Sequence, residues 1–337
     1  ATISASPGII TQGETATLSW NSTNVTTAEI DQGIGTVAVN GSLEVSPTQT
    51  TTYTITATGD GGTAIAFITI TVNPAIPLPP DPSTVAPLIG LTVATSLDSA
   101  TAFLYTGGNP IQTGLAAETI KAYRCAVLRG KVLNRDNQPL SGVAITVLNH
   151  PEFGRTLSRA DGMFDMVVNG GGYLTVDYKK DGYLTAQRQV DAPWEDYAWL
   201  DDVVMVPVDT QVTTIDLSSS LEMQVAQGNV VNDNDGTRTA TVLFSQGTTA
   251  EMVLPDGTTQ PLTTLNVRAT EYTVGENGPE KMPAELPPQS GYTYCVELSV
   301  DEALSAGATD VQFNQPLYFY VDNFLDFPVG MAVPAGY

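Results

Sequence analysis

Apolar and polar residues alternate with period two over most of the chain. In the first 74 residues, the runs 14–20, 42–46, 51–58 and 63–72 each place β-branched or aromatic residues on one face and Thr or Ser on the other. Thr makes up 18 of these 74 residues, and it favours strands because its branched Cβ restricts χ1. Gly and Pro turn signals separate the runs at short spacing, so the pattern predicts a β-sandwich here.

Strand patterns continue through the rest of the chain. From Cys125 onward the chain contains further strand-like runs, and several of the turns between them contain Asp-Gly or Gly-Gly, which is typical of hairpins. These runs are AVLRGKVLN, VAITVL, MFDMVV, YLTVDYK and YLTAQRQV. Beyond about residue 209 the runs TATVLF, LNVRATEYTV, YTYCVELSV and VQFNQPLYFYV are again strand-like. The fold class predicted is all-β, with three tandem β-sandwich domains.

A proline-rich tract separates the first sandwich from the rest. The segment NPAIPLPPDP, at 73–82, contains five prolines, which favour an extended, semi-rigid spacer. We therefore predict an immunoglobulin-like sandwich at 1–74 that moves independently, followed by a linker and lead-in at 75–122. Two further sandwiches are expected at 123–208 and 209–337, and we expect the last to continue beyond Tyr337.

Two of these regions resemble known domains. The TLSW and PTQTTTYTITAT segments are similar to the small immunoglobulin-like repeats of bacterial surface proteins. The region from Cys125 resembles the carboxypeptidase regulatory-like, or transthyretin-like, domain. That resemblance rests on Gly130, Val132, Pro139, Leu140, Gly142, Val143, Asp161, Gly162, Phe164, Gly182 and Tyr183. It implies an accessory sandwich without the zinc ligands of the peptidase.

The last region resembles ZU-type sandwiches, and it is more similar still to the plug-like domain that precedes the shell in teneurins. Residues from about 100 to 337 together resemble the segment ahead of the YD repeats in bacterial Rhs/YD-repeat proteins, with HPEFGRTLSRADGMFDMVVNGGG and PWEDYAW as the most specific stretches. The resemblance implies a non-catalytic stalk and plug-like lead-in of a large secreted or cell-surface protein. The partner it implies is a downstream YD-repeat shell of the same polypeptide.

The charge of the chain excludes several classes of partner. Only 15% of residues are charged, and the net charge is −23. This negative charge disfavours binding to nucleic acid and to anionic membranes. No Lys or Arg occurs before Lys121, and this asymmetry indicates separate modules. No apolar run reaches the roughly 18 residues of a membrane span, so no membrane insertion is expected. The N-terminal residues lack the basic region of a signal peptide, so we expect that one was removed or lies upstream of this sequence. The acidic, Thr-rich composition favours a secreted or bacterial cell-surface location.

Residues for catalysis are scarce. His150 is the single His, so a His-rich metal site is excluded, and no G-x-S-x-G nucleophile motif occurs. Carboxylate pairs carry no information in a chain with 36 acidic residues. We predict no catalytic residue, no metal ligand, no cofactor and no enzymatic activity.

Two segments suggest ligand binding. In the segment 191–202, Trp194, Tyr197 and Trp199 lie among acidic residues, so the rings could stack on a surface glycan or contact a protein, and the acids could hold Ca²⁺. The alternative is that the aromatics pin a long loop onto the sandwich. VNDNDGTR, at 231–238, is calcium-like but lacks the first ligand of the EF-hand pattern, so an acidic turn is favoured.

The two cysteines and the C-terminal aromatics complete the candidates. Cys125 and Cys295 would staple two domains if they form a disulfide, but alternation also allows Cys295 to pack as a free thiol. Six aromatic residues occur between Phe313 and Phe327, more than one strand needs. We expect some of them, Phe324 and Phe327 in particular, to form a surface patch that docks against the downstream shell.

Overall fold

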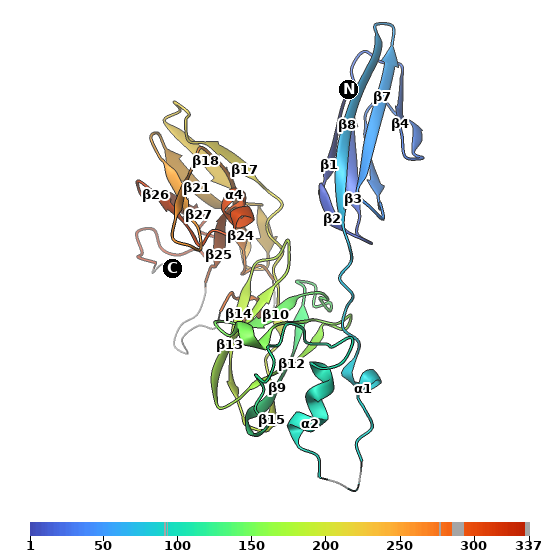
Figure 1. Ribbon diagram of the computed structural model, residues 1–337. Helices are drawn as coiled ribbons and strands as arrows, with labels where there is room; N and C mark the ends of the chain where they lie inside the picture. The colour runs from blue at the N-terminus through green and yellow to red at the C-terminus, as the bar shows by residue number, and fades with distance from the viewer. Residues whose placement is uncertain (91, 93, 276–277, 285–292, 334–337) are drawn as a thin grey trace. The chain divides into compact units, whose positions relative to one another are not determined.

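The structure is a computed structural model that describes all residues except 91, 93, 276–277, 285–292 and 334–337. Most of its regular secondary structure is strand, so the all-β fold class is confirmed (Figure 1). The chain divides into two compact units, Ala1–Pro77 and Leu78–Tyr337. The domain ends expected at residues 74, 122 and 208 stay predictions, and the last four residues of the expected third domain lie outside the described ones.

The first unit contains two sheets, with strand orders β1-β3-β6 and β2-β8-β7-β4-β5. Their strands are β1 (Thr2–Ser6), β2 (Ile9–Thr11), β3 (Ala16–Asn21), β4 (Thr27–Ile30), β5 (Gly35–Val37), β6 (Gly41–Val45), β7 (Thr51–Gly59) and β8 (Gly62–Asn73). Apolar residues spaced by two fill the space between the sheets, as the alternation predicts. Trp20 is buried among them, and its indole N–H donates to the carbonyl oxygen of Ala38 at 2.8 Å.

The second unit begins with short helices and a sandwich that matches the transthyretin-like prediction. One sheet has the order β11-β10-β13-β14 and the other β12-β9-β15, with β16 also paired to β9. The strands are β9 (Cys125–Leu133), β10 (Ala144–Val147), β11 (Thr156–Leu157), β12 (Met163–Asn169), β13 (Gly172–Lys179), β14 (Ala186–Ala192), β15 (Asp196–Trp199) and β16 (Val203–Val204). The helices are α1 (Pro82–Val85), α2 (Leu97–Thr101), η1 (Ala102–Leu104), η2 (Ala122–Arg124) and η3 (Pro151–Phe153).

The lead-in packs on the outer face of the β12-β9-β15 sheet. Leu104 and Ile111 join Cys125, Val127 and Val167 in a buried cluster that is separate from the core of the sandwich. Strand β9 is therefore buried on both faces over its first residues, which explains its continuous run of apolar residues.

Gln112 ties the lead-in to the free edge of β12. Its side chain is fully buried, and it donates to the carbonyl oxygens of Phe153 and Val167 and accepts from the N–H of Val167, at 2.7–2.9 Å. The side chain thus replaces a neighbouring strand at this edge. Gly154 allows the lead-in to come this close, because a Cβ there would lie 2.1 Å from the carbonyl oxygen of Thr113.

The rest of the second unit is a further β-sandwich. Its sheets have the orders β17-β24-β25, β18-β21-β27 and β23-β22-β26, with a small hairpin of β19 and β20. The strands are β17 (Thr213–Asp216), β18 (Met223–Gln227), β19 (Val231–Asp233), β20 (Gly236–Arg238), β21 (Ala240–Ser245), β22 (Ala250–Val253), β23 (Thr259–Leu262), β24 (Thr264–Glu271), β25 (Val296–Val300), β26 (Asp310–Phe313) and β27 (Tyr318–Val321). The helices are α3 (Gly278–Lys281) and α4 (Asp301–Ala306).

The two sandwiches of the second unit share an apolar contact. Leu184 and Val206 from the first pack with Tyr272 and Met282 from the second. The Arg188 guanidinium donates to the carbonyl oxygens of Met282 at 3.0 Å and of residue 280 at 2.7 Å. Apolar burial and charge-assisted hydrogen bonds therefore both hold this joint.

Candidate functional site

The aromatic residues at 194–199 lie on and beside β15, which runs parallel to β9. Ala198 pairs with Leu128, and both are buried in the sandwich core. Because side chains alternate along a strand, Tyr197 and Trp199 lie on the outer face of the sheet. Trp194 and Trp199 are 61% and 65% exposed, so both indole rings present surface to solvent.

A buried charge cluster supports the two rings on the outer face. The guanidinium carbon of Arg129 lies 4.9 Å from the ring centroid of Tyr197 and 5.4 Å from that of Trp199. Arg129 donates to one carboxylate oxygen of Asp165 at 2.5 Å, and Arg159 donates to the other at 2.5 Å. The cation holds the rings in place. The contact with Arg129 supports the interpretation that the aromatic residues pin this segment onto the sandwich. The exposed ring faces are also consistent with ligand binding.

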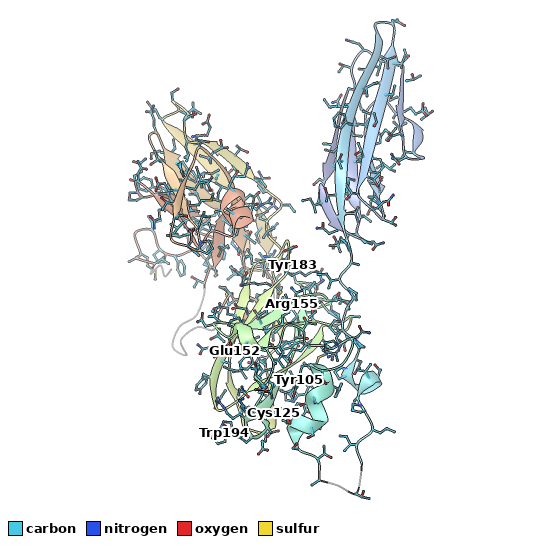
Figure 2. The ribbon with its side chains drawn as sticks, viewed as in Figure 1. Tyr105, Cys125, Glu152, Arg155, Tyr183 and Trp194 are labelled. Carbon is cyan, nitrogen blue, oxygen red and sulfur yellow. The ribbon has the colours of Figure 1, made fainter. Side chains whose placement is uncertain are left out.

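Trp194 lies over a glycine turn at the end of the sheet, in the part of the sandwich labelled in Figure 2. Gly171 has a φ of +97°, and a Cβ built there would lie 1.9 Å from the indole nitrogen of Trp194. Both the turn and the ring position therefore require glycine at this site. This requirement explains the Gly-rich NGGG turn in the sequence.

Phe324 contacts a buried arginine inside its own domain. The guanidinium carbon of Arg238 lies 4.5 Å from the Phe324 ring centroid, and the ring of Tyr294 meets Phe324 edge-on at 6.1 Å. Phe324 and Phe327 are each half-buried. Part of the Phe324 surface that we expected to face a partner is thus occupied within the domain.

The calcium-like segment forms an ion-paired turn. Arg238 binds both carboxylate oxygens of Asp233, at 2.8 and 2.9 Å, and donates to Glu271 at 2.6 Å. These bonds hold the pKa of Asp233 well below its usual range, chiefly through the hydrogen bonds from Arg238. Among the described residues, no group of three or more His, Cys, Asp or Glu side chains is arranged to hold a metal ion. Asp233 thus has an arginine partner.

An exposed apolar surface on the last sandwich lies on neighbouring strands. Val225, Leu243 and Tyr318 are direct cross-strand neighbours in β18, β21 and β27. Tyr318 and Tyr320 are 58% and 57% exposed, and Met223 extends the surface along β18. We call this surface the β27 face and define it by Met223, Val225, Leu243, Tyr318 and Tyr320. The aromatic run predicted exposed rings, but the contribution of β18 depends on strand register, which the sequence does not give.

His150 makes local contacts. Its Nδ1 lies 2.9 Å from a carboxylate oxygen of Glu152, and its ring stacks on Phe153 at 5.4 Å. This contact lowers the pKa of Glu152. His150 also lines an open cavity of about 570 Å³ with Arg155 and Asp177. Figure 2 labels Glu152 and Arg155 in this part of the sandwich.

The two cysteines are free thiols in separate clusters. Cys125 packs beneath the lead-in, with its sulfur 3.7 Å from the hydroxyl of Thr101, and Tyr105 belongs to the same cluster (Figure 2). Cys295 packs at the joint between the two sandwiches of the second unit. Burial raises the pKa of both thiols, that of Cys295 to about 11.

The transthyretin-like sandwich also has sequence relatives. Residues 120–205 match the family described as "Teneurin TTR-like domain". Teneurin-3 of Mus musculus is 40% identical over 93 residues, which are 28% of this chain and 3% of that protein. Teneurin-4 of Homo sapiens is 33% identical over 113 residues, or 34% of this chain and 4% of the relative. Teneurin-m of Drosophila melanogaster is 37% identical over 95 residues, or 28% and 3%.

The matches cover a small part of each relative, because the chain spans only 3–4% of the teneurins it matches. They support the predicted transthyretin-like domain and make it teneurin-like. A streptococcal ancillary pilin structure overlaps 45% of this chain and 53% of its own, with 10% identity and a TM-score of 0.23, which is too low to identify a common fold. No helix in the described part of the chain is long and apolar enough to span a membrane.

Proposed function

We propose that this chain is a non-catalytic structural and interaction segment of a large cell-surface or secreted protein, and that it forms the stalk and plug-like lead-in to a YD-repeat shell of the same polypeptide. The teneurin-like transthyretin-like domain at 120–205 supports the class of protein. The immunoglobulin-like unit forms the stalk, and the last sandwich makes the plug-like contact.

The β27 face carries the proposal. Its row of Val225, Leu243 and Tyr318 crosses three strands in register, and the residues at both ends of the row are exposed. Covering such a face removes apolar surface from water and stabilises a complex. We propose that the shell contacts this face and not Phe324, because the Phe324 ring packs on Arg238.

Binding to a separately expressed repeat region tests this function. The double variant Tyr318→Thr/Tyr320→Thr keeps β-branched residues in the strand, so it should fold and bind at least about tenfold more weakly. Tyr173→Thr is the matched control, because Tyr173 is an exposed tyrosine on β13 of the other sandwich. Unchanged affinity of the double variant would contradict the proposal.

A second candidate function is recognition of a glycan or a protein by the surface around Trp199. The observation that favours it is the exposure of both Trp194 and Trp199 on the transthyretin-like sandwich. Sugar rings stack on exposed aromatic faces through apolar contact. A glycan array on the wild type and on Trp194→Ala/Trp199→Ala tests it, and equal signals from both proteins would contradict it.

A further inference from the structure

The last sandwich is open along the side where two of its sheets end. Strand β25 is the final strand of the β17-β24-β25 sheet, and β26 is the final strand of the β23-β22-β26 sheet. Helix α4 connects the two strands. An opening between terminal strands gives access to the interior of a sandwich, because no further strand closes it.

A groove of about 310 Å³ occupies this opening. Its inner wall is formed by core residues of the sandwich, Val242, Phe244 and Val267, and its mouth by Leu298 and Leu304. Both leucines are exposed, by 45% and 56%. Since a water molecule takes up about 30 Å³ of liquid, the groove has room for aliphatic side chains.

The backbone of β25 is available for pairing at this edge. Tyr272 donates its N–H to the carbonyl oxygen of Cys295 at 2.9 Å, which fixes the ladder between β24 and β25. Alternation along an antiparallel pair then directs the N–H and C=O groups of Glu297 and Ser299 to β24. Those of Val296 and Leu298 point away from β24, and no described residue supplies them with a backbone partner.

The surroundings of the groove are acidic. Glu297 and Asp310 both line it, and no Lys or Arg occurs in the sequence after Lys281. The carboxylate of Glu297 makes no ion pair with a described residue, and burial raises its pKa. A basic partner is therefore favoured over a neutral or an acidic one.

We propose that this groove, which we call the β25 groove, binds an extended segment of a partner protein that alternates apolar and basic residues. The segment pairs with the free edge of β25 through Val296 and Leu298 and inserts its apolar side chains between β25 and β26. Its basic side chains point toward the acidic rim. Strand addition gives affinity through main-chain hydrogen bonds and specificity through the alternate side chains. The site is distinct from the β27 face, so it does not depend on the proposed shell contact.

Short peptides and a backbone variant test the proposal on the whole chain. The probe is a six-residue peptide of alternating valine and lysine, with a valine–glutamate peptide of equal length as the charge control. Leu298→Pro removes the outward N–H of β25, and proline is tolerated at an edge strand on that side. Leu298→Ala is the matched control, because it shortens the same side chain and keeps the N–H. Thermal unfolding establishes that both variants fold.

The proposal predicts that the lysine peptide binds and the glutamate peptide does not. Leu298→Pro should weaken binding at least about tenfold, and Leu298→Ala should weaken it less. Glu297→Gln should also weaken binding and make it less sensitive to salt. Equal binding of both peptides, or unchanged binding by a folded Leu298→Pro variant, overturns the proposal. If the chain self-associates in sedimentation and Leu298→Pro abolishes this, the occupant is a second copy, which also contradicts the partner proposed here.

Discussion

The guanidinium of Arg238 lies over the ring of Phe324, 4.5 Å from its centroid. The same arginine is 1% exposed and binds the carboxylates of Asp233 and Glu271. Two carboxylates, one cation and one aromatic ring therefore form a compact buried cluster in the last sandwich. Phe324 serves the domain's own packing, which is why the partner contact is assigned to the β27 face.

Removing the cation should destabilise the last sandwich strongly. Arg238→Met removes the cation that pairs with Asp233 and Glu271, so we expect a loss of about 3–5 kcal/mol in the free energy of unfolding. Arg268→Met is the comparison, because Arg268 pairs with Asp301 at a more exposed position and should lose less, about 1 kcal/mol. Urea unfolding measures both. Equal losses would show that burial of the Arg238 cluster contributes nothing beyond an ordinary ion pair.

The same cluster predicts that the stability of the last sandwich depends on pH. The folded pKa of Asp233 lies below its unfolded value of about 3.9, so the folded state binds fewer protons in this range. The contribution to stability is complete above the unfolded pKa and is lost as the pH falls below about 4. Asp233→Asn should therefore flatten the decline in stability below about pH 4. Asp235→Asn, in the same turn, should leave the decline close to that of the wild type.

The alternation of the sequence was sufficient to predict the all-β fold, because the period of the side chains follows directly from strand geometry. The sequence also predicted hairpin turns in the transthyretin-like domain, since Asp-Gly and Gly-Gly are preferred in tight turns between strands. The pairing of the strands could not be predicted from the sequence. Met223 and Val225 join Tyr318 only through the register of β18 with β21 and β27, which involves residues about 95 positions apart.

The role of Gln112 was also hidden in the sequence. No local sequence pattern marks a single buried amide that completes the edge of β12. The segment that contains it was predicted only as a linker and lead-in. Gln112→Leu should cost about 2–3 kcal/mol, because it leaves the backbone groups of Val167 and Phe153 unsatisfied. Gln189→Leu, at an exposed position of β14, is the matched control. A loss no larger than that of the control would show that water replaces the amide.

The cysteines should behave as two unpaired thiols. Cys125 and Cys295 pack in separate clusters, and the pKa of Cys295 is raised to about 11 by burial. Reaction of the folded protein with a thiol reagent at pH 8 should therefore be slow, because little thiolate is present. In denaturant without reductant, the count should be two thiols per chain. A count of none would establish the disulfide that the sequence left open.

Hydroxyl-radical footprinting can show whether the β27 face is covered when a repeat region follows this chain. The oxidation rates of Tyr318 and Tyr320 are compared between this chain alone and the chain joined to the proposed YD-repeat region, with the 77%-exposed Tyr173 as internal reference. We expect both tyrosines on the β27 face to be protected in the longer protein, while Tyr173 reacts at the same rate. Equal reactivity of Tyr318 and Tyr320 in the two proteins would contradict a plug-like role for this sandwich.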